Sequence, residues 1–594
     1  MTNITINGKT LQVEDGLTIM EAASKNNIFI PSLCYLKDVH KFGSCRICVV
    51  EVDKAKSLLA SCITPVQEGM VIRTNTTRVR KSRRILYELM LSDHPRDCLS
   101  CSRSQNCELQ ALGERIGVPG CRFEGESSPN NVDQTPSITR DASKCILCRR
   151  CVTVCNGIQM VGAINAQNRG FKTVISAAME LPLSQVSCVG CGQCTLVCPV
   201  GALKETPAIP QVWDVLNDPT KRKVVQVAPA IRAAIGEEFG YEPGTLVTGK
   251  LAAVLRQVGF DDVFDTNFAA DLTIIEEGTE LLGRLKSALQ GGDAKLPMIT
   301  SCSPGWIKFS EHFFPNSLDY ISTCKSPHTM LGALAKTYYA KKAGVDPHDM
   351  YVVSVMPCTA KKFEISRPEM QNEGLPNVDA VLTTRELAGL IRQVGVDFRT
   401  MPDEDFDSPL GLSTGAADIF GVTGGVMEAA LRTVYELVTG TELPFDKLHV
   451  SPIMGLEQIK EAAITFNDTL DEYSFLKGVT LRVAVTSGLK GARQLLEQVV
   501  KGTSPYHFIE VMCCPGGCIA GGGQPRPTNE EVCQKRMNAI YREDEGKTLR
   551  KSHNNPYITQ IYEEFLGVPN GHLSHELLHT NYTKRGKYNE LLDN

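Results

Sequence analysis

The sequence predicts a multidomain protein in which small α+β units precede a large α/β region. Its 594 residues are too many for one hydrophobic core, and length alone suggests about four domains. The first third carries its cysteines in closely spaced groups. From residue 222 to 540, apolar strand-like runs alternate with amphipathic helical patterns, which indicates layered α/β structure with largely parallel strands.

The composition excludes several classes of function. A hydrophobic fraction of 42% and a charged fraction of 22% are typical of a soluble globular protein. A net charge of −5 leaves no basic footprint for nucleic acid. The polar start, MTNITINGKT, is unlike a secretory signal, and no run of 18 apolar residues is present to insert into a membrane. We therefore expect a cytoplasmic protein.

The unusual feature of the composition is its 23 cysteines. A long cytoplasmic chain keeps its thiols reduced, and reduced cysteines in tight groups are usually metal ligands. Fifteen of them, with one histidine, form four groups between residues 34 and 198. Several metal centres are therefore expected.

Residues 1–78 are expected to form a small α+β domain. Alternating apolar residues on either side of Asn7-Gly8 predict a hairpin, residues 17–27 predict a short helix, and VVEVD and VIRTN predict further strands. Four thiolates on such a scaffold, which we expect to be a β-grasp fold, favour a 2Fe-2S cluster over zinc. The four are Cys34, Cys45, Cys48 and Cys62.

Residues 79–120 are predicted to be mostly helical and to hold a mixed ligand group: His94, Cys98, Cys101 and Cys107. One imidazole and three thiolates can bind a 4Fe-4S cluster or a zinc ion, and the spacing does not decide between them. Their position between two iron–sulfur units favours the cluster, because a redox chain needs contiguous carriers. A polar segment at 124–137 predicts a linker.

Residues 138–207 contain one pattern twice, C-x2-C-x2-C-x3-C, at an offset of 43 residues. In two-cluster ferredoxins the fourth cysteine of each pattern ligates the other cluster. The expected ligand sets for two 4Fe-4S clusters are Cys145, Cys148, Cys151 and Cys198, and Cys188, Cys191, Cys194 and Cys155. Paired zinc knuckles, the alternative, rarely use this doubled spacing. A helix or a hairpin should separate the two patterns.

In the region 210–594, three short stretches begin where an apolar run ends: TSCSPGW (300–306), MPCTAKKFE (356–364) and EVMCCPGGCIAGGG (510–523). Residues at the strand ends of an open α/β sheet line the ligand crevice, and glycines let the backbone approach a cofactor. The glycines of IFGVTGGVMEAA (419–430) fit no nucleotide fingerprint, so we expect a loop packed on the cofactor there. Cys121 and Cys533 stand apart and are expected to be structural.

Together, the four cysteine groups and the three stretches resemble the iron-only (FeFe) hydrogenases, of the large type with four accessory clusters. The resemblance runs from Cys34 to HELLHTNY near the C-terminus. It implies a large two-lobed α/β catalytic domain with a C-terminal tail similar to a small subunit. It also implies reversible oxidation of H2 to protons and electrons at a six-iron centre. In the family, one cysteine sulfur joins a 4Fe-4S cubane to a two-iron unit with CO, cyanide and a bridging azadithiolate.

The resemblance assigns roles by position in the motifs. Cys358, Cys514 and Cys518 would ligate the cubane, and Cys518 would supply the bridging sulfur. Lys361 would donate a hydrogen bond to a cyanide. Four residues would line the pocket of the two-iron unit: Ala228, Pro229, Met356 and Met512.

Two positions depart from the family. The family usually has two adjacent cysteines in the first stretch; here Cys302 is kept as the last proton carrier, but Ser303 stands in place of the remaining cubane ligand. Our hypothesis is that Cys324, in STCKSPH, replaces that thiolate; the Ser303 oxygen and a rearranged Cys302 are alternatives, and Cys513 is a weaker competitor. His328 stands close to the active centre where relatives often carry glutamine.

The proton supply is expected along one helix face. Glu277, Glu280 and Arg284 are spaced three and four residues apart, which alone would indicate a solvated, salt-bridged face. The resemblance instead implies a relay that runs from Cys302 through Glu277, Ser322 and Glu280, with Arg284 at the outer end.

The resemblance leaves the electron partner open. The N-terminal cluster domains and the tail are similar to those of the catalytic subunit of NAD(P)-linked hydrogenases, including electron-bifurcating ones, yet the chain shows no flavin or nicotinamide fingerprint. We therefore expect flavin- and NAD(P)-binding partner subunits, with a stand-alone ferredoxin-dependent enzyme as the alternative. A non-catalytic H2 sensor or iron–sulfur assembly protein is a third alternative, and the retained proton carriers and Lys361 argue against it.

Overall fold

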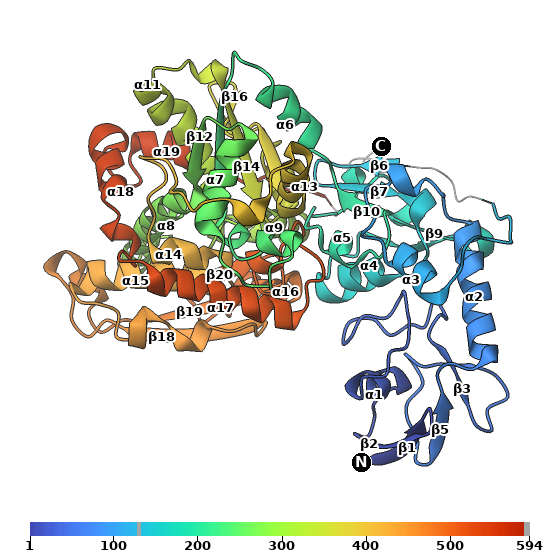
Figure 1. Cartoon of the computed structure of the whole chain (residues 1–594). Helices are drawn as coiled ribbons and strands as arrows, with labels where there is room; N and C mark the ends of the chain where they lie inside the picture. Colours follow the sequence, from blue (N-terminus) through green and yellow to red (C-terminus); the bar gives the residue numbers. More distant parts are fainter. Residues whose placement is uncertain (127–131, 587–594) are drawn as a thin grey trace.

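The protein, described by a computed structural model over residues 1–126 and 132–586, has three parts arranged in chain order (Figure 1). An N-terminal domain at the lower right of the figure leads into a cysteine-rich middle part, which lies against a large α/β region. Residues 127–131 of the predicted linker lie outside the described residues. Across the described ranges, no helix has the length and apolar character needed to cross a lipid bilayer.

The N-terminal domain is a five-stranded sheet in the order β2-β1-β5-β3-β4, with one helix, α1 (Ile19–Lys25). The strands are β1 (Thr2–Ile6), β2 (Lys9–Val13), β3 (Val49–Val52), β4 (Leu59–Ala60) and β5 (Met70–Arg73). The predicted hairpin is present: Asn7 and Gly8 have φ angles of 51° and 84°, as a type I′ turn requires. β1 also pairs in parallel with β5, which closes the sheet around α1.

The middle part begins with the predicted helices, α2 (Thr77–Ser92) and α3 (Glu108–Ile116). Three strands then form one sheet: β6 (Val132–Gln134), β7 (Ile138–Asp141) and β10 (Leu203–Glu205). The two short helices α4 (Arg150–Thr153) and α5 (Gln193–Val197) carry cysteines of the repeated pattern. The segment between the patterns is a hairpin, β8 (Asn165–Gln167) and β9 (Val174–Ser176).

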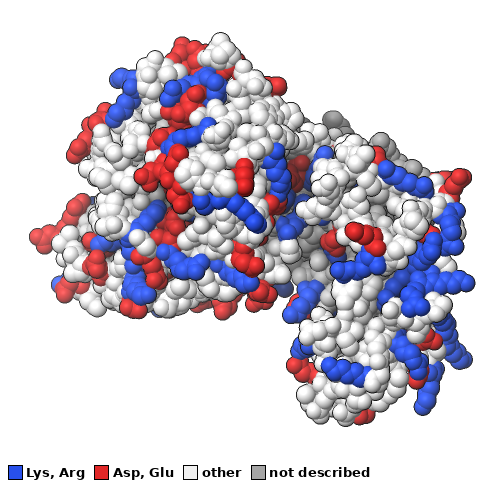
Figure 2. Space-filling model, viewed as in Figure 1, with Lys and Arg blue, Asp and Glu red and all other residues white. Residues whose placement is uncertain are grey.

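The surface of the middle part is unevenly charged. Figure 2 shows Lys and Arg gathered along the edge of the molecule where α2 runs, whereas both signs are interspersed over the large α/β region. The exposed basic residues of α2 are Arg78, Arg80, Lys81 and Arg84.

The large α/β region contains two four-stranded sheets. The first has the order β12-β11-β14-β17 and is entirely parallel: β11 (Arg222–Val227), β12 (Asp262–Asp265), β14 (Met350–Met356) and β17 (Ala380–Thr383). The second has the order β13-β20-β19-β18: β13 (Met298–Ile299), β18 (Ile459–Thr465), β19 (Thr480–Ser487) and β20 (Phe508–Met512). Only β18 among these pairs is antiparallel. The predicted two-lobed α/β architecture is therefore confirmed.

One long helix, α8 (Thr266–Leu289), joins the two lobes. Phe268 and Leu272 pack into the core of the first sheet, and Ile274 and Leu281 pack into the core of the second. The helix also packs against α10 (Pro327–Leu334) on one side and α15 (Gly425–Thr439) on the other. Side chains that face neither core are therefore enclosed between the lobes.

The middle part is attached to the large region by buried hydrogen bonds. The Gln159 amide donates to Cys513 O at 3.0 Å and accepts from Leu489 N at 3.2 Å. Gln193 donates to Ala520 O at 2.9 Å. These contacts fix the repeated cysteine patterns beside the loop that follows β20.

The lobes also depend on a buried arginine. Arg232 donates to Asp265 Oδ1 at 2.8 Å, at the end of β12, and to Asp418 Oδ1 at 3.1 Å, in the other lobe. All three side chains are essentially inaccessible to solvent. Removing one partner of such a buried group leaves an uncompensated charge, which costs about 3–5 kcal/mol.

We therefore predict that Arg232→Met lowers the free energy of unfolding by about 3–5 kcal/mol. Urea unfolding followed by circular dichroism measures this. The control is Lys447→Met, since Lys447 and its partner Glu545 are 60% and 38% exposed, and its midpoint should stay at the wild-type value. An Arg232→Met midpoint equal to that of the control would show that the ion pairs do not hold the lobes together.

Candidate functional site

The two repeated patterns close around two separate cavities. One cavity is lined by Cys145, Cys148, Cys151 and Cys198. The other is lined by Cys155, Cys188, Cys191 and Cys194. Cys155 follows α4 and Cys198 follows α5, so each pattern sends its fourth cysteine to the other cavity. This is the exchange that the spacing predicts.

The four cysteines of the N-terminal domain are buried and in mutual contact. Cys48 Sγ lies 3.4 Å from Cys62 Sγ, and Leu33 N donates to Cys45 Sγ at 3.4 Å. Hydrogen bonds from Cys45 and Cys62 lower the pKa of Cys34 well below the ordinary range of a thiol. The same hydrogen bonds raise the pKa values of Cys45 and Cys62, because these thiols donate to their neighbours. Four buried cysteines in contact are suited to bind iron.

The mixed histidine–cysteine group is more accessible to solvent than the four cysteines of the N-terminal domain. Cys98 is exposed, and Cys101 and Cys107 are partly buried. His94 Nδ1 is buried and meets no hydrogen-bond partner in the part of the chain that the structure describes. Cys101 Sγ lies 2.8 Å from the place of a Cβ on Gly201, so only glycine fits there. A partly buried histidine and three partly accessible cysteines would suit a cluster site near the surface.

In the large region, strand ends from both sheets bring three further thiols together. Cys358 follows β14 of the first sheet, and Cys514 and Cys518 follow β20 of the second. Burial and the thiols of Cys514 and Cys518 raise the pKa of Cys358, while the nearby Lys361 ammonium opposes the rise. Three thiols beside one cation form a donor set that fits an iron–sulfur cubane.

Glycines hold the loop after β20 close to its neighbours. Gly517 has a φ of 92°, and a Cβ on it would lie 2.7 Å from Thr423 N and 2.9 Å from Met512 Sδ. A Cβ on Gly522 would lie 2.4 Å from Cys191 O. The loop is therefore fixed between the second lobe and the middle part, and the thiols that it carries have little freedom.

Lys361 is held by a network that includes His328. Its Nζ lies 2.7 Å from Glu364 Oε2 and donates to Cys302 O at 3.1 Å. His328 Nε2 contacts the same Glu364 oxygen at 2.7 Å. Burial, reinforced by the Lys361 charge, lowers the pKa of His328 to about 4. The ring is therefore neutral near pH 7 and orients Glu364 without adding a charge to the site.

The predicted pocket residues lie at the ends of strands from both sheets. Ala228 follows β11, and its N–H donates to Val355 O at 3.0 Å; Pro229 comes next. Met356 ends β14 and Met512 ends β20, and each is 3% exposed. Buried apolar residues therefore lie at the ends of strands from both sheets, and their role in lining a pocket for the two-iron unit stays a prediction.

Buried carboxylates lead away from Cys302 along α8. Burial and then the Glu277 carboxylate raise the pKa of Cys302. Ser322 Oγ donates to Glu280 Oε2 at 2.9 Å and also bonds to Glu277. Arg284 Nη2 donates to Glu280 Oε1 at 2.6 Å. The hydrogen bonds thus join Glu277 to Arg284 through Ser322 and Glu280. Cys302 is near enough to Glu277 for that charge to raise its pKa, and the proton relay itself stays a prediction.

Glu277 titrates near neutral pH. Burial, with the charge of Glu280 adding to it, raises its pKa to about 7. Ser301 donates to Glu277 Oε1 from both its N–H and its hydroxyl, at 3.3 Å each. A carboxyl with this pKa can both accept and release a proton under working conditions.

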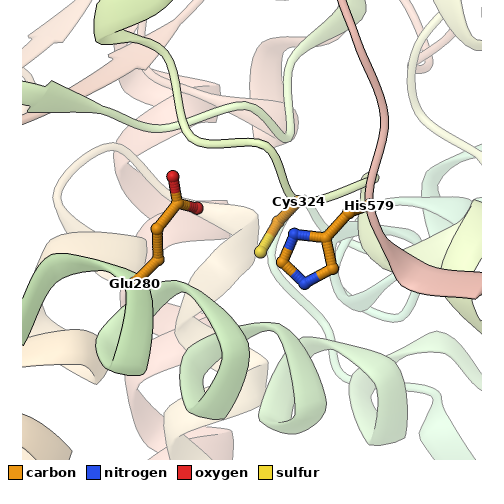
Figure 3. Close-up of side chains that lie close together, drawn as sticks. All are labelled: Glu280, Cys324 and His579. Carbon is orange, nitrogen blue, oxygen red and sulfur yellow. The ribbon is translucent and has the colours of Figure 1, made fainter. Parts of the chain in front are cut away.

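Cys324 lies beside the carboxylates of α8 that include Glu277 and Glu280, which we call the acid chain, and not beside the three thiols. Figure 3 shows its sulfur between Glu280 of α8 and His579, and the ligand atoms of these three residues lie within 4.8 Å of one another. Cys324 pairs with His579 in an antiparallel bridge, which turns its side chain toward α8. Burial is the main cause that raises the pKa of Cys324, and the charges of Glu280 and Glu277 raise it further. This position contradicts our hypothesis that Cys324 replaces the missing cubane ligand.

Several residues of this acid chain were not singled out from the sequence. Thr323 Oγ1 bonds to Glu280 Oε2 at 3.3 Å and to His579 Nδ1 at 2.7 Å. His579 Nε2 lies 3.2 Å from Glu276 Oε2. The two histidines four residues apart in HELLH could have pointed to His579, because its ring contacts that of His575 in a tilted arrangement with the ring centroids 4.2 Å apart.

Comparison with protein families covers nearly the whole chain. Residues 221–522 match the iron only hydrogenase large subunit, C-terminal domain, and residues 530–585 match the iron hydrogenase small subunit. Residues 1–77 match a 2Fe-2S iron–sulfur cluster binding domain. Residues 83–121 match the NADH-ubiquinone oxidoreductase-G iron–sulfur binding region, and residues 135–202 match a 4Fe-4S dicluster domain.

Individual relatives agree with these matches. The chain is 52% identical to the NADP-reducing hydrogenase subunit HndD of Solidesulfovibrio fructosivorans, over 98% of this chain and 99% of that protein. It is 38% identical to iron hydrogenase 1 of Clostridium pasteurianum, over 98% and 100%. A solved structure of the FeFe-hydrogenase HydA1 from Chlamydomonas reinhardtii is 44% identical with a TM-score of 0.58, over 64% of this chain and all of that one.

The chain therefore belongs to the FeFe hydrogenases, and the resemblance found in the sequence is confirmed. It is an oxidoreductase with iron–sulfur cofactors of the 2Fe-2S and 4Fe-4S kinds.

The pKa of Glu277 gives a direct spectroscopic prediction. Because its pKa is about 7, the carboxyl should be protonated about one pH unit below that value and ionised about one unit above it. Infrared difference spectra of the holoenzyme should show a protonated carboxyl band that disappears as pH rises through about 7. The band should be absent from Glu277→Gln. A wild-type band that has already disappeared at pH values near the ordinary pKa of glutamate, about 4.3, would show that burial does not raise the pKa.

Proposed function

We propose that this chain catalyses the reversible reaction H2 ⇌ 2H⁺ + 2e⁻ at a six-iron centre bound by Cys358, Cys514 and Cys518. The observation that supports this most is the meeting of three buried thiols, the Lys361 cation and Cys302, which begins a buried acid chain. When bound, the centre supplies an open iron site and a neighbouring base, at which H2 is divided into protons and electrons.

The residues of the chain would then move the protons. Cys302 exchanges a proton with the base and with Glu277, whose pKa of about 7 lets it carry the proton in either direction. The Ser322 hydroxyl links Glu277 to Glu280. An arginine does not release its proton in proteins, so Arg284 orients Glu280 and does not itself carry a proton.

The polar and apolar neighbours of the site would hold the centre. Lys361, fixed by Glu364, presents an ammonium that suits a hydrogen bond to an anionic cyanide. The buried side chains of Ala228, Pro229, Met356 and Met512 exclude bulk water from the two-iron unit.

Electrons would leave through four accessory clusters. We assign one 2Fe-2S cluster to the N-terminal cysteines, one 4Fe-4S cluster to His94 with its three cysteines, and two 4Fe-4S clusters to the cavities of the repeated patterns. The cavity that contains Cys191 is next to the active-site loop, because Cys191 O faces Gly522. The N-terminal and histidine-ligated clusters would be alternative exits toward partners.

We further propose that the chain is the hydrogenase subunit of an NAD(P)-linked complex in the cytoplasm. The relative that is 52% identical over 98% of this chain is an NADP-reducing hydrogenase subunit, which supports this proposal. Flavin and nicotinamide would bind partner subunits, which permits electron bifurcation in the complex. The exposed basic residues of α2 would offer an acidic partner a surface near the histidine-ligated cluster (Figure 2). A stand-alone enzyme that uses ferredoxin is the alternative.

The catalytic proposal predicts separate effects on the centre and on proton transfer. Matured wild-type protein should show infrared bands of bound CO and cyanide and should evolve H2 from a reduced dye. Glu277→Gln should keep these bands but lose about 100-fold or more of the turnover, since it removes a proton carrier. Gas chromatography measures the turnover.

The matched control is Glu510→Gln. Glu510 is also buried with a pKa near 7, but it accepts hydrogen bonds from Gly424 N and Met427 N at the start of α15. It should retain most of the turnover. Wild-type protein that lacks both the infrared bands and turnover after maturation would refute the proposed function and favour a non-catalytic sensor or assembly protein.

The partner proposal predicts the native size. Protein isolated without oxygen from its source should migrate well above the mass of the single chain and should reduce NADP⁺ with H2. Replacing the four exposed basic residues of α2 by serine should slow association with the partner, and the effect should be largest at low salt. A monomer that exchanges electrons only with ferredoxin would favour the stand-alone enzyme.

A further inference from the structure

Ser303 and Cys513 lie opposite one another just beyond the ends of the neighbouring strands β13 and β20. β13 pairs with β20 so that Met298 is opposite Phe508 and Ile299 is opposite Ile509. The same register, continued past the strand ends, places Ser303 opposite Cys513. Ser303 Oγ indeed accepts a hydrogen bond from Cys513 N at 3.1 Å. The position that lacks the expected thiol is therefore adjacent to a cysteine.

The Cys513 side chain lies at the turn that contains Ser303. Its Sγ is 2.7 Å from the place that a Cβ would take on Gly305, so only a glycine leaves room for it. Its thiol hydrogen-bonds to those of Cys191 and Cys514. The residue is 2% exposed, and the Gln159 amide holds its carbonyl at 3.0 Å. Cys513 therefore lies in a prepared position beside a predicted cubane ligand.

The other candidates for the fourth ligand are less suitable. The Ser303 hydroxyl already accepts the hydrogen bond from Cys513, and an alcohol is a poor ligand in a thiolate site. Cys302 leads into the acid chain, where it is needed as a proton carrier. Cys324 faces Glu280 and His579 (Figure 3).

We propose that Cys513 supplies the fourth thiolate of the cubane, so that a Ser303–Cys513 pair replaces the usual cysteine at position 303. The proposal rests on the proposed function, because it concerns a ligand of that centre. It also explains why one loop carries three thiols within six residues, Cys513, Cys514 and Cys518. A consequence is that one ligand of the active centre touches Cys191, a predicted ligand of the adjacent accessory cluster.

The test uses the full-length chain, reconstituted with iron and sulfide alone so that only the cubane part of the centre forms. Iron analysis and Mössbauer spectroscopy are compared for wild type, Cys513→Ala and Cys324→Ala. We expect Cys324→Ala to match wild type. Cys513→Ala should lose about four iron atoms per chain, the content of one 4Fe-4S cluster, or give a 3Fe-4S signal in electron paramagnetic resonance after mild oxidation.

A compensating variant keeps the test decisive if Cys513→Ala folds poorly. Ser303→Cys combined with Cys513→Ala moves the thiol from position 513 to the facing position 303. This double variant should restore wild-type iron content and spectra. The proposal is overturned if Cys513→Ala keeps an oxidation-stable cubane, or if Cys324→Ala loses one. A wild-type protein without the extra cubane would instead count against the proposed function itself, so the two failures are distinguishable.

Discussion

The site depends on one geometric constraint: strand ends from two separate sheets must meet. Cys358 comes from the first sheet, and Cys302, Cys514 and Cys518 come from the second. Thiols from one sheet edge would lie in a row and could not surround a cubane. Because the lengths of iron–sulfur bonds vary little, the fold has to hold the two lobes in fixed positions relative to each other, to within a fraction of a bond length.

Helix α8 contributes to that constraint and to the chemistry at once. Its apolar residues pack into both cores, which leaves a third face enclosed between the lobes. Burying carboxylates on that face costs free energy, because a low dielectric disfavours their charge. The same cost raises the pKa of Glu277 to about 7, where it is useful for proton transfer. Burial on the helix thus costs stability but gives Glu277 the pKa that the proposed proton transfer requires.

Local spacing determined most of what could be predicted from the sequence. The crossing of the fourth cysteines between the two cavities depends on near neighbours in the chain. So do the apolar runs between residues 222 and 540 that became β11, β13, β14, β17, β19 and β20. β12 and β18 were not predicted, because β12 (DVFD) has an aspartate at each end and β18 alternates with polar residues at an edge. The position of Cys324 was wrong for a different reason. Its direction is set by pairing with His579, 255 residues away, and no local pattern records that pairing.

Under the proposed function, protons and electrons would leave the centre in different directions. Cys302 opens toward α8 and its carboxylates, whereas the loop with Cys513 and Cys514 lies against Cys191 of the middle part. Under the proposed function, each oxidation of H2 would yield two protons and two electrons, which have to reach different acceptors. Separate routes remove both kinds of charge while Lys361, paired with Glu364 beside a neutral His328, keeps the fixed charge of the site constant. The neutral histidine matters here, because a second cation at that position would change the electrostatic balance with pH and couple the electron potential to an unrelated titration.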